Sequence, residues 1–175
     1  FGEEKYNKRI AFQIINLRKK KEIDTQDLVK IINKVKKKKA YGRINEATKS
    51  FQALRIFVNN EISELIFGLI NATKKLKLGS MLVVVTFHSL EDKIVKYYFK
   101  TYSERSKNPS RYIPEIVKKD KRLFNCPQKK PLVASEKEIL LNPPSRSAKL
   151  RYVIRNDNKF IFPKDLINKF QSYLD

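Results

Sequence analysis

The sequence predicts an α/β fold in which an apolar strand lies between two helices. An apolar stripe that repeats every three to four residues runs from about residue 46 to residue 77, which is typical of a long helix. Residues 81–87 are continuously apolar and rich in β-branched side chains, which favours a strand buried on both faces, as in a parallel sheet. Ser89 then opens another helical pattern. This order indicates a unit of a doubly wound sheet.

Two shorter helical patterns precede the long one. Residues 3–21 carry an apolar stripe typical of a helix, and three lysines end this pattern. Residues 24–36 carry a second stripe, and Asp24 or Thr25 can cap the helix that it predicts. The second pattern ends in a basic run over residues 36–43. This run is either a solvated helix end or a phosphate contact, and the pattern leaves both interpretations open.

The last part of the chain carries weaker patterns. Residues 103–130 are rich in Lys, Arg, Ser, Pro and Asn, which predicts a functional basic loop or a partly disordered insertion. Residues 130–134 and 149–155 are candidate strands, and residues 157–175 predict a short tail helix that docks on the body. Two weak late strands cannot flank a buried strand on both sides. We therefore expect the C-terminal part of a larger α/β fold.

Charge and composition narrow the classes of function. Lys and Arg number 39 against 18 Asp and Glu, so the net charge is +21, which favours a polyanionic partner such as nucleic acid. A lysine-rich solvated surface is the alternative, because Lys outnumbers Arg 29 to 10. One Cys and one His exclude a disulfide framework and a Cys- or His-rich metal site, and a cytoplasmic compartment is expected. The four glycines form no glycine-rich nucleotide loop.

A cluster of polar side chains follows the predicted strand. In open α/β sheets ligands bind outside the carboxyl ends of the strands, so we expect His88 and Ser89 at a pocket, supported by Phe87, Glu91 and Asp92. The alternative is structural: Ser89 caps the next helix, Asp92 completes a capping box, and His88 bridges backbone groups. A Ser-His hydrolase is disfavoured because adjacent residues on a turn rarely face each other and the G-x-S-x-G motif is missing.

A second candidate region surrounds Asn142. The stretch Asn142-Pro143-Pro144-Ser145 resembles the Asn-Pro-Pro-aromatic loop of amino-group methyltransferases, but it has Ser in the aromatic position. A simple Pro-Pro turn is the alternative. Basic side chains suited to phosphate contacts are Lys8, Arg9, Lys49, Arg55, Arg146, Lys149 and Arg151.

Four blocks of sequence together resemble the RsmH (MraW) family. The blocks are residues 1–11 (FGEEKYNKRIA), 47–61 (ATKSFQALRIFVNNE), 87–96 (FHSLEDKIVK), and Asn142-Pro143 with 146–151 (RSAKLR). The resemblance implies an S-adenosylmethionine-dependent methyltransferase that acts on the exocyclic N4 amine of a cytidine in small-subunit (16S) ribosomal RNA. It also implies a class I, Rossmann-like sheet with an inserted helical domain.

The resemblance covers only the C-terminal half of the family. It implies that residues 1–45 end the inserted RNA-recognition domain, that 46–156 form the C-terminal part of the methyltransferase domain, and that 157–175 form a tail helix. The principal cofactor contacts of the family lie in the other half, so none is assigned here. We expect the isolated chain to be inactive and to self-associate.

The resemblance also implies roles for individual residues. The cytidine amine attacks the sulfonium methyl in line, and no metal is needed. His88 and Ser89 would line the target-base side of the pocket, with Asn142 nearby, while Glu91 and Asp92 stiffen the turn. Arg146 and Arg151 would hold RNA phosphate. The Asn-Pro-Arg-Ala-Arg stretch of the family is Asn142-Pro143-Pro144-Ser145-Arg146 here, so Pro144 stands in place of one arginine. The competing hypothesis is a non-catalytic basic module that binds RNA or the ribosome.

Overall fold

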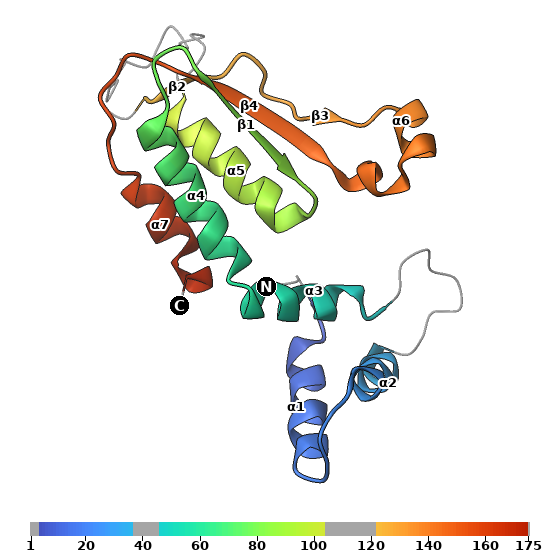
Figure 1. The fold of residues 1–175 in the computed structure, drawn as a ribbon. Coiled ribbons are helices and arrows are strands. Elements are labelled where there is room, and N and C mark those ends of the chain that lie inside the picture. Colours follow the sequence, from blue (N-terminus) through green and yellow to red (C-terminus); the bar gives the residue numbers. More distant parts are fainter. Residues whose placement is uncertain (1–3, 37–45, 104–121, 175) are drawn as a thin grey trace, which may run out of the picture. The chain divides into compact units, whose positions relative to one another are not determined.

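The computed structural model describes residues 4–36, 46–103 and 122–174, and it divides after Glu61 into two compact units. The first unit is helical, and the second combines helices with a sheet (Figure 1).

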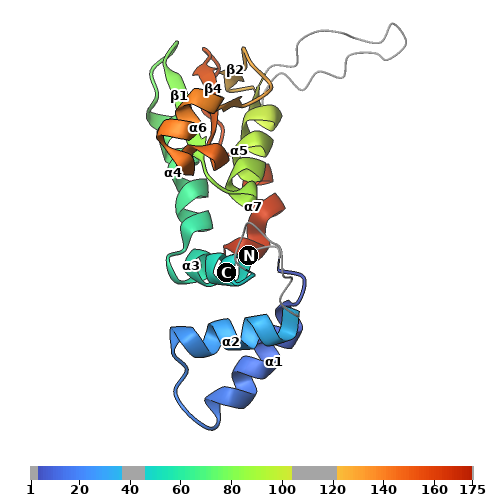
Figure 2. The same cartoon turned by 90° about the vertical axis from the view of Figure 1, so that its right-hand side faces the viewer.

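The first unit contains α1 (Asn7–Arg18), α2 (Thr25–Lys36) and α3 (Thr48–Val58). Helices α1 and α2 pack against each other, as Figure 2 shows from a second side, and their buried core includes Ile10 and Ile32. Asp24 caps α2, because its carboxylate accepts a hydrogen bond from the Asp27 N–H at 2.7 Å. The two predicted N-terminal helices are therefore confirmed, with α1 shorter than expected.

A buried ion pair joins the end of α2 to the segment that precedes α1. The Lys36 ammonium lies 2.5 Å from the Glu4 carboxylate, and the two side chains are only 6% and 8% exposed. The Ser50 hydroxyl of α3 donates to the same carboxylate at 2.9 Å. Lys36 is thus not a solvated helix end, as one interpretation of the basic run had it. Residues 37–43 of that run lie outside the described residues.

The predicted long helix is in fact two helices. Helix α3 ends at Val58, and α4 runs from Glu61 to Lys75. Between them Asn60 has a φ of 52°, in the left-handed region. Asparagine tolerates this conformation better than most residues, so the chain can turn here without glycine or proline.

The second unit is built around an antiparallel sheet. After α4, the elements are β1 (Met81–Thr86), α5 (Ser89–Tyr102), β2 (Phe124–Asn125), β3 (Leu132–Val133), α6 (Glu136–Leu141), η2 (Pro143–Ser147), β4 (Lys149–Arg155), α7 (Lys164–Phe170) and η3 (Gln171–Tyr173). Strand β4 pairs antiparallel with β1, β2 and β3. The late strands predicted within residues 130–134 and over 149–155 are confirmed.

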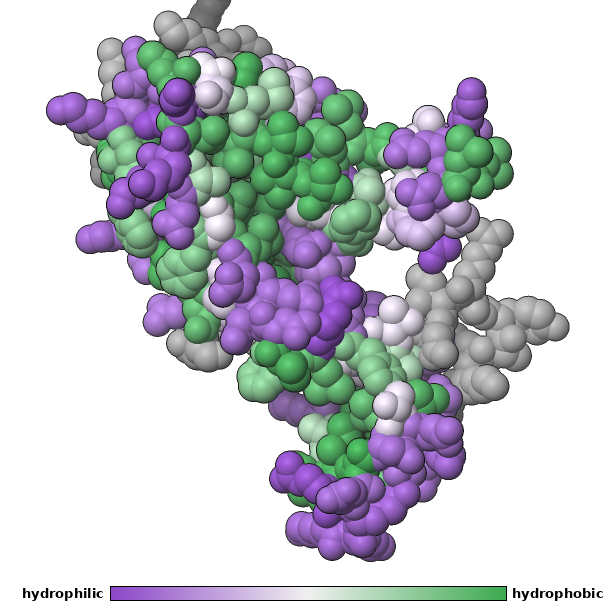
Figure 3. Space-filling model, in the orientation of Figure 1, coloured by the Kyte–Doolittle hydropathy of each residue, from purple (hydrophilic) through white to green (hydrophobic). Residues whose placement is uncertain are grey.

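Strand β1 does not have the predicted surroundings. It pairs antiparallel with β4, and Met81, Val83 and Val85 are about half exposed. Successive strand residues face opposite sides of a sheet, so these three share one face, and the described residues leave that face open. Figure 3 shows apolar surface in green around this sheet. The prediction of a parallel strand buried on both faces is therefore wrong for the described chain.

Strand β4 turns its basic residues inward. Arg151 and Arg155 are 9% and 8% exposed, and Val153 between them is fully buried. The Arg155 guanidinium donates to the Leu123 carbonyl at 3.0 Å and to the Asn156 carbonyl at 2.9 Å. These hydrogen bonds compensate for burying a charge, so the inner face of β4 is held by arginine as well as by apolar packing.

The segments around β4 contain one helix and one strand that were not predicted. Residues 104–121 of the expected basic loop lie outside the described residues, but Leu123 and Phe124 near its end are fully buried, and Phe124 begins β2. Helix α6 was not predicted, whereas the Pro-Pro turn is confirmed as η2.

The tail helix is confirmed as α7. Its Leu166 and Phe170 are buried, and the Phe170 ring meets the Tyr97 ring of α5 edge to face at 5.6 Å between centroids. Among the described residues, no helix combines the length and apolar character that crossing a membrane requires.

Candidate functional site

The turn after β1 is fixed by a reciprocal capping box. His88 is the N-cap of α5, and its Nδ1 accepts a hydrogen bond from the Glu91 N–H at 3.3 Å. In return the Glu91 carboxylate accepts hydrogen bonds from the Phe87 and His88 N–H groups at 2.9 and 3.3 Å. The predicted box of Ser89 and Asp92 is therefore wrong by one residue, because only His88 has the extended backbone that a cap needs.

Both ring nitrogens of His88 face Glu91. Because Nδ1 accepts, the proton of the neutral ring sits on Nε2, and Nε2 lies 3.2 Å from Glu91 Oε1 without hydrogen-bond direction. The His88 side chain is only 10% exposed. Burial tends to raise the pKa of Glu91, but the adjacent His88 side chain and the hydrogen bonds from the Phe87 and His88 N–H groups outweigh burial and lower the pKa. The contacts between His88 and Glu91 therefore hold the turn between β1 and α5 in one conformation.

Asp92 is bound to β4 instead of capping. The Arg151 guanidinium donates to its two carboxylate oxygens at 2.7 and 3.3 Å, and Lys149 donates at 3.2 Å. Arg151 also donates to the Lys129 carbonyl at 3.1 Å. Burial would raise the pKa of Asp92, but Arg151 and Lys149 hold it below its ordinary value. The first turn of α5 is therefore fixed to the sheet.

The Asn142 region reaches the same end of the sheet as His88. Thr86, the last residue of β1, pairs with Lys149, the first residue of β4, and its hydroxyl donates to the Lys149 carbonyl at 3.3 Å. Because η2 directly precedes β4, it too lies at this end. Phe87 is 58% exposed, and the side chains of Ser89 and Asn142 are also exposed. The structure thus brings the two predicted site regions to one edge.

The predicted RNA-binding residues have different environments. Lys8, Arg9, Lys49 and Arg146 are exposed. Arg55 is 57% exposed but forms an ion pair with Glu61 at 2.7 Å. Arg151 is buried against Asp92, so its guanidinium is committed inside the protein. The sequence did not reveal this role, because the two partners are 59 positions apart.

Comparison with known proteins gives the family. The model of the MraW methylase family matches residues 1–156, most of the chain. The chain belongs to the MraW methylase family.

Similar proteins support the same family assignment. Three proteins named "Ribosomal RNA small subunit methyltransferase H" are similar to it: one from Methylorubrum extorquens (42% identical, 90% of this chain and 45% of the relative), one from Methylocella silvestris (46%, 89% and 45%) and one from Caulobacter vibrioides (39%, 90% and 51%). The chain spans about half the length of these curated relatives.

The residues at the end of β1 do not by themselves fit the methyl donor of a MraW methylase. The two carboxylates in the first turn of α5, Glu91 and Asp92, are already engaged by His88 and Arg151. The described glycines, Gly68 and Gly79, lie in α4 and in the turn before β1, at the opposite end of that strand.

Proposed function

We propose that this chain is part of an enzyme that transfers a methyl group from S-adenosylmethionine to the exocyclic N4 amine of a cytidine in small-subunit ribosomal RNA. The observation that carries the proposal is the family match, together with relatives that bear the name of a small-subunit ribosomal RNA methyltransferase over nine-tenths of the chain. The net charge of +21 supports an RNA substrate. Such an enzyme works where ribosomes are made, so we expect it in the cytoplasm.

The proposal includes a division of labour along the chain. Residues 1–45 would belong to an inserted helical domain that recognises RNA, residues 46–156 to a class I, Rossmann-like methyltransferase domain, and residues 157–175 to a tail helix. The principal contacts with S-adenosylmethionine would lie outside these 175 residues.

The residues at the end of β1 would position the target base. The cytidine amine is a weak nucleophile because its lone pair is conjugated with the ring, so it must be oriented and hydrogen-bonded by the protein. We assign that contact to the exposed Ser89 and Phe87, with Asn142 from the segment that precedes β4 at the same end of the sheet. His88 would act through Glu91, because their mutual contacts hold the backbone that carries Phe87 and Ser89.

Exposed cations would hold the RNA backbone. In the second unit these are Arg146 and Lys149, which flank the start of β4, although Lys149 also contacts Asp92. In the first unit they are Lys8, Arg9, Lys49 and the half-exposed Arg55. Phosphate contacts of this kind position RNA without reading its sequence.

The test measures methyl transfer by the complete protein that contains these residues. Small ribosomal subunits and S-adenosylmethionine with a labelled methyl group are the substrates. We expect transfer by the wild type, and a lower kcat/KM with His88→Ala. Ser135→Ala is the matched control, because the Ser135 hydroxyl caps α6 in the same way, by accepting from the Glu138 N–H at 3.2 Å.

Two outcomes would contradict the proposal. If the folded wild type transfers no methyl group yet binds small subunits, the chain belongs to a non-catalytic RNA-binding protein. If His88→Ala behaves like Ser135→Ala while methyl transfer persists, the end of β1 is not the target-base site.

A further inference from the structure

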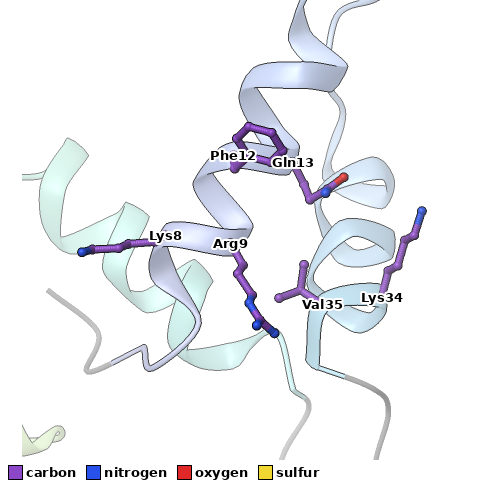
Figure 4. A pocket seen from close by; sticks show the side chains of 6 residues that line it. All are labelled: Lys8, Arg9, Phe12, Gln13, Lys34 and Val35. Carbon is purple, nitrogen blue, oxygen red and sulfur yellow. The ribbon is translucent and has the colours of Figure 1, made fainter.

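A basic groove runs along the seam between α1 and α2 in the helical unit. It has a volume of about 520 Å³ and is lined by Lys8, Arg9, Phe12, Gln13, Lys34 and Val35. Figure 4 shows that Arg9 and Gln13 of α1 point toward α2 and that Val35 of α2 points toward α1. Lys8 extends from the far side of α1. The lining of the groove is therefore mixed: Phe12 and Val35 are apolar, whereas the other lining residues are polar or cationic.

The charge around this groove is strongly one-sided. Residues 4–36 contain ten Lys or Arg and four Asp or Glu. A second hollow shares Gln13 and Lys34 with the first and continues along the seam past Lys20 and Lys30. The carboxylate that lines it, Asp27, is already paired with Lys21 at 2.6 Å. A row of cations beside a groove is suited to the phosphates of a nucleic-acid strand.

Phe12 adds an exposed aromatic ring to the lining of the groove. Its side chain is 61% exposed, although the core of α1 and α2 lies close by. The ring stands one residue from Gln13 and one helical turn from Arg9. An exposed aromatic ring in the same groove as a cation and an amide can stack on a nucleobase, while the amide forms hydrogen bonds with the edge of that base.

We propose that this groove binds one unpaired nucleotide of RNA. The base stacks on Phe12, Gln13 contacts its edge, and Arg9 and Lys34 hold the adjoining phosphates, with Lys8 at the flank. The RNA identity of the ligand rests on the proposed function, and the groove itself rests on the geometry of α1 and α2. A duplex does not fit, because its paired bases are stacked on each other and cannot reach the ring.

Direct binding measurements test the groove. Fluorescence anisotropy would report binding of the 175-residue chain to a labelled, unstructured pyrimidine RNA and to a duplex of the same length. We expect tighter binding to the single strand, and Phe12→Ala should weaken that binding by at least about fivefold. Phe12→Tyr keeps the ring and should retain the affinity.

Two further variants separate stacking from charge and from general apolar contact. Ile15→Ala is the matched control, because Ile15 is 47% exposed on the same helix but does not line the groove. It should leave binding unchanged. Arg9→Gln should reduce the slope of log K against log salt concentration by roughly 0.7, the value for one phosphate contact on a single strand.

Three results would contradict the proposal that this groove binds an unpaired nucleotide. The first is equal binding by Phe12→Ala and Ile15→Ala, and the second is equal affinity for duplex and single strand. The third is binding to vesicles of anionic lipid that depends on Phe12, without any binding to RNA. That result would mean that this surface contacts a membrane. If the wild type methylates small subunits while Phe12→Ala is neutral in binding, only the groove fails and the proposed function stands.

Discussion

The ion pair between Asp92 and Arg151 joins α5 to the sheet, and its removal gives a quantitative prediction. Arg151→Met deletes two hydrogen bonds to Asp92 and one to the Lys129 carbonyl. It leaves a carboxylate that is 9% exposed and retains Lys149, whose side chain is 41% exposed. Breaking a buried pair costs about 3–5 kcal/mol, and the remaining Lys149 favours the lower end, about 3 kcal/mol.

Urea unfolding followed by circular dichroism at pH 7 measures this cost. Arg55→Met is the matched control, since the ion pair of Arg55 with Glu61 has a similar 2.7 Å contact but a guanidinium side chain that is 57% exposed. The control should cost less than about 1 kcal/mol. Asp92→Ala combined with Arg151→Met should cost clearly less than the sum of the two single changes, because no charge is then left buried alone.

The same pair predicts how stability depends on pH. The pKa of Asp92 is lowered in the folded state from its ordinary value of 3.8. The stability from this group is therefore fully present above that value and is lost as the pH falls through the lower, folded pKa. Asp92→Asn should remove this part of the acid sensitivity. The reasoning is refuted if Arg151→Met costs no more than Arg55→Met.

Three other features make separate predictions. Asn60→Ala should lower the free energy of unfolding by about 1 kcal/mol, because of the left-handed backbone, whereas Asn60→Gly should not; thermal unfolding measures both. Burial would raise the pKa of Glu4, but the contact of its carboxylate with Lys36 outweighs burial and lowers the pKa. The stability that Glu4 adds should therefore be lost only below its ordinary pKa of 4.5. Glu4→Gln should reduce this loss of stability in acid-unfolding curves. Burial raises the pKa of Tyr98 to about 12 even though its hydroxyl donates to Thr73 at 2.9 Å, so an ultraviolet titration of Tyr98→Phe should lack one late-ionising phenol.

Elements with a strong local pattern could be predicted from the sequence. Helices α1, α2 and α7 show apolar stripes, and β4 alternates along its length. The interruption of the helical pattern at Asn60 was not predicted, because asparagine accepts a left-handed backbone but does not require it. The antiparallel pairing of β1 with β4 was also missed. An apolar run predicts a strand, but it carries no information on which neighbours cover each face.

The position of the candidate site between a strand and a helix could be predicted from the sequence, but the contacts of its residues could not. The polar cluster after β1 was found because it follows an apolar strand and opens a helix. The choice of Ser89 as the cap followed the usual preference for serine, whereas the structure selects His88, whose extended backbone lets Glu91 reach back to its N–H. The partnership of Asp92 with Arg151 depends on the pairing of β1 with β4, which no local pattern encodes.

The identity of the methylated nucleoside tests the central claim most directly. Small-subunit RNA would be incubated with S-adenosylmethionine and the complete protein that contains these residues, digested to nucleosides, and separated by chromatography with mass detection. We expect N4-methylcytidine in the treated RNA and none after omission of the protein. Methylation only at carbon 5 of cytidine, or at another base, would contradict the account.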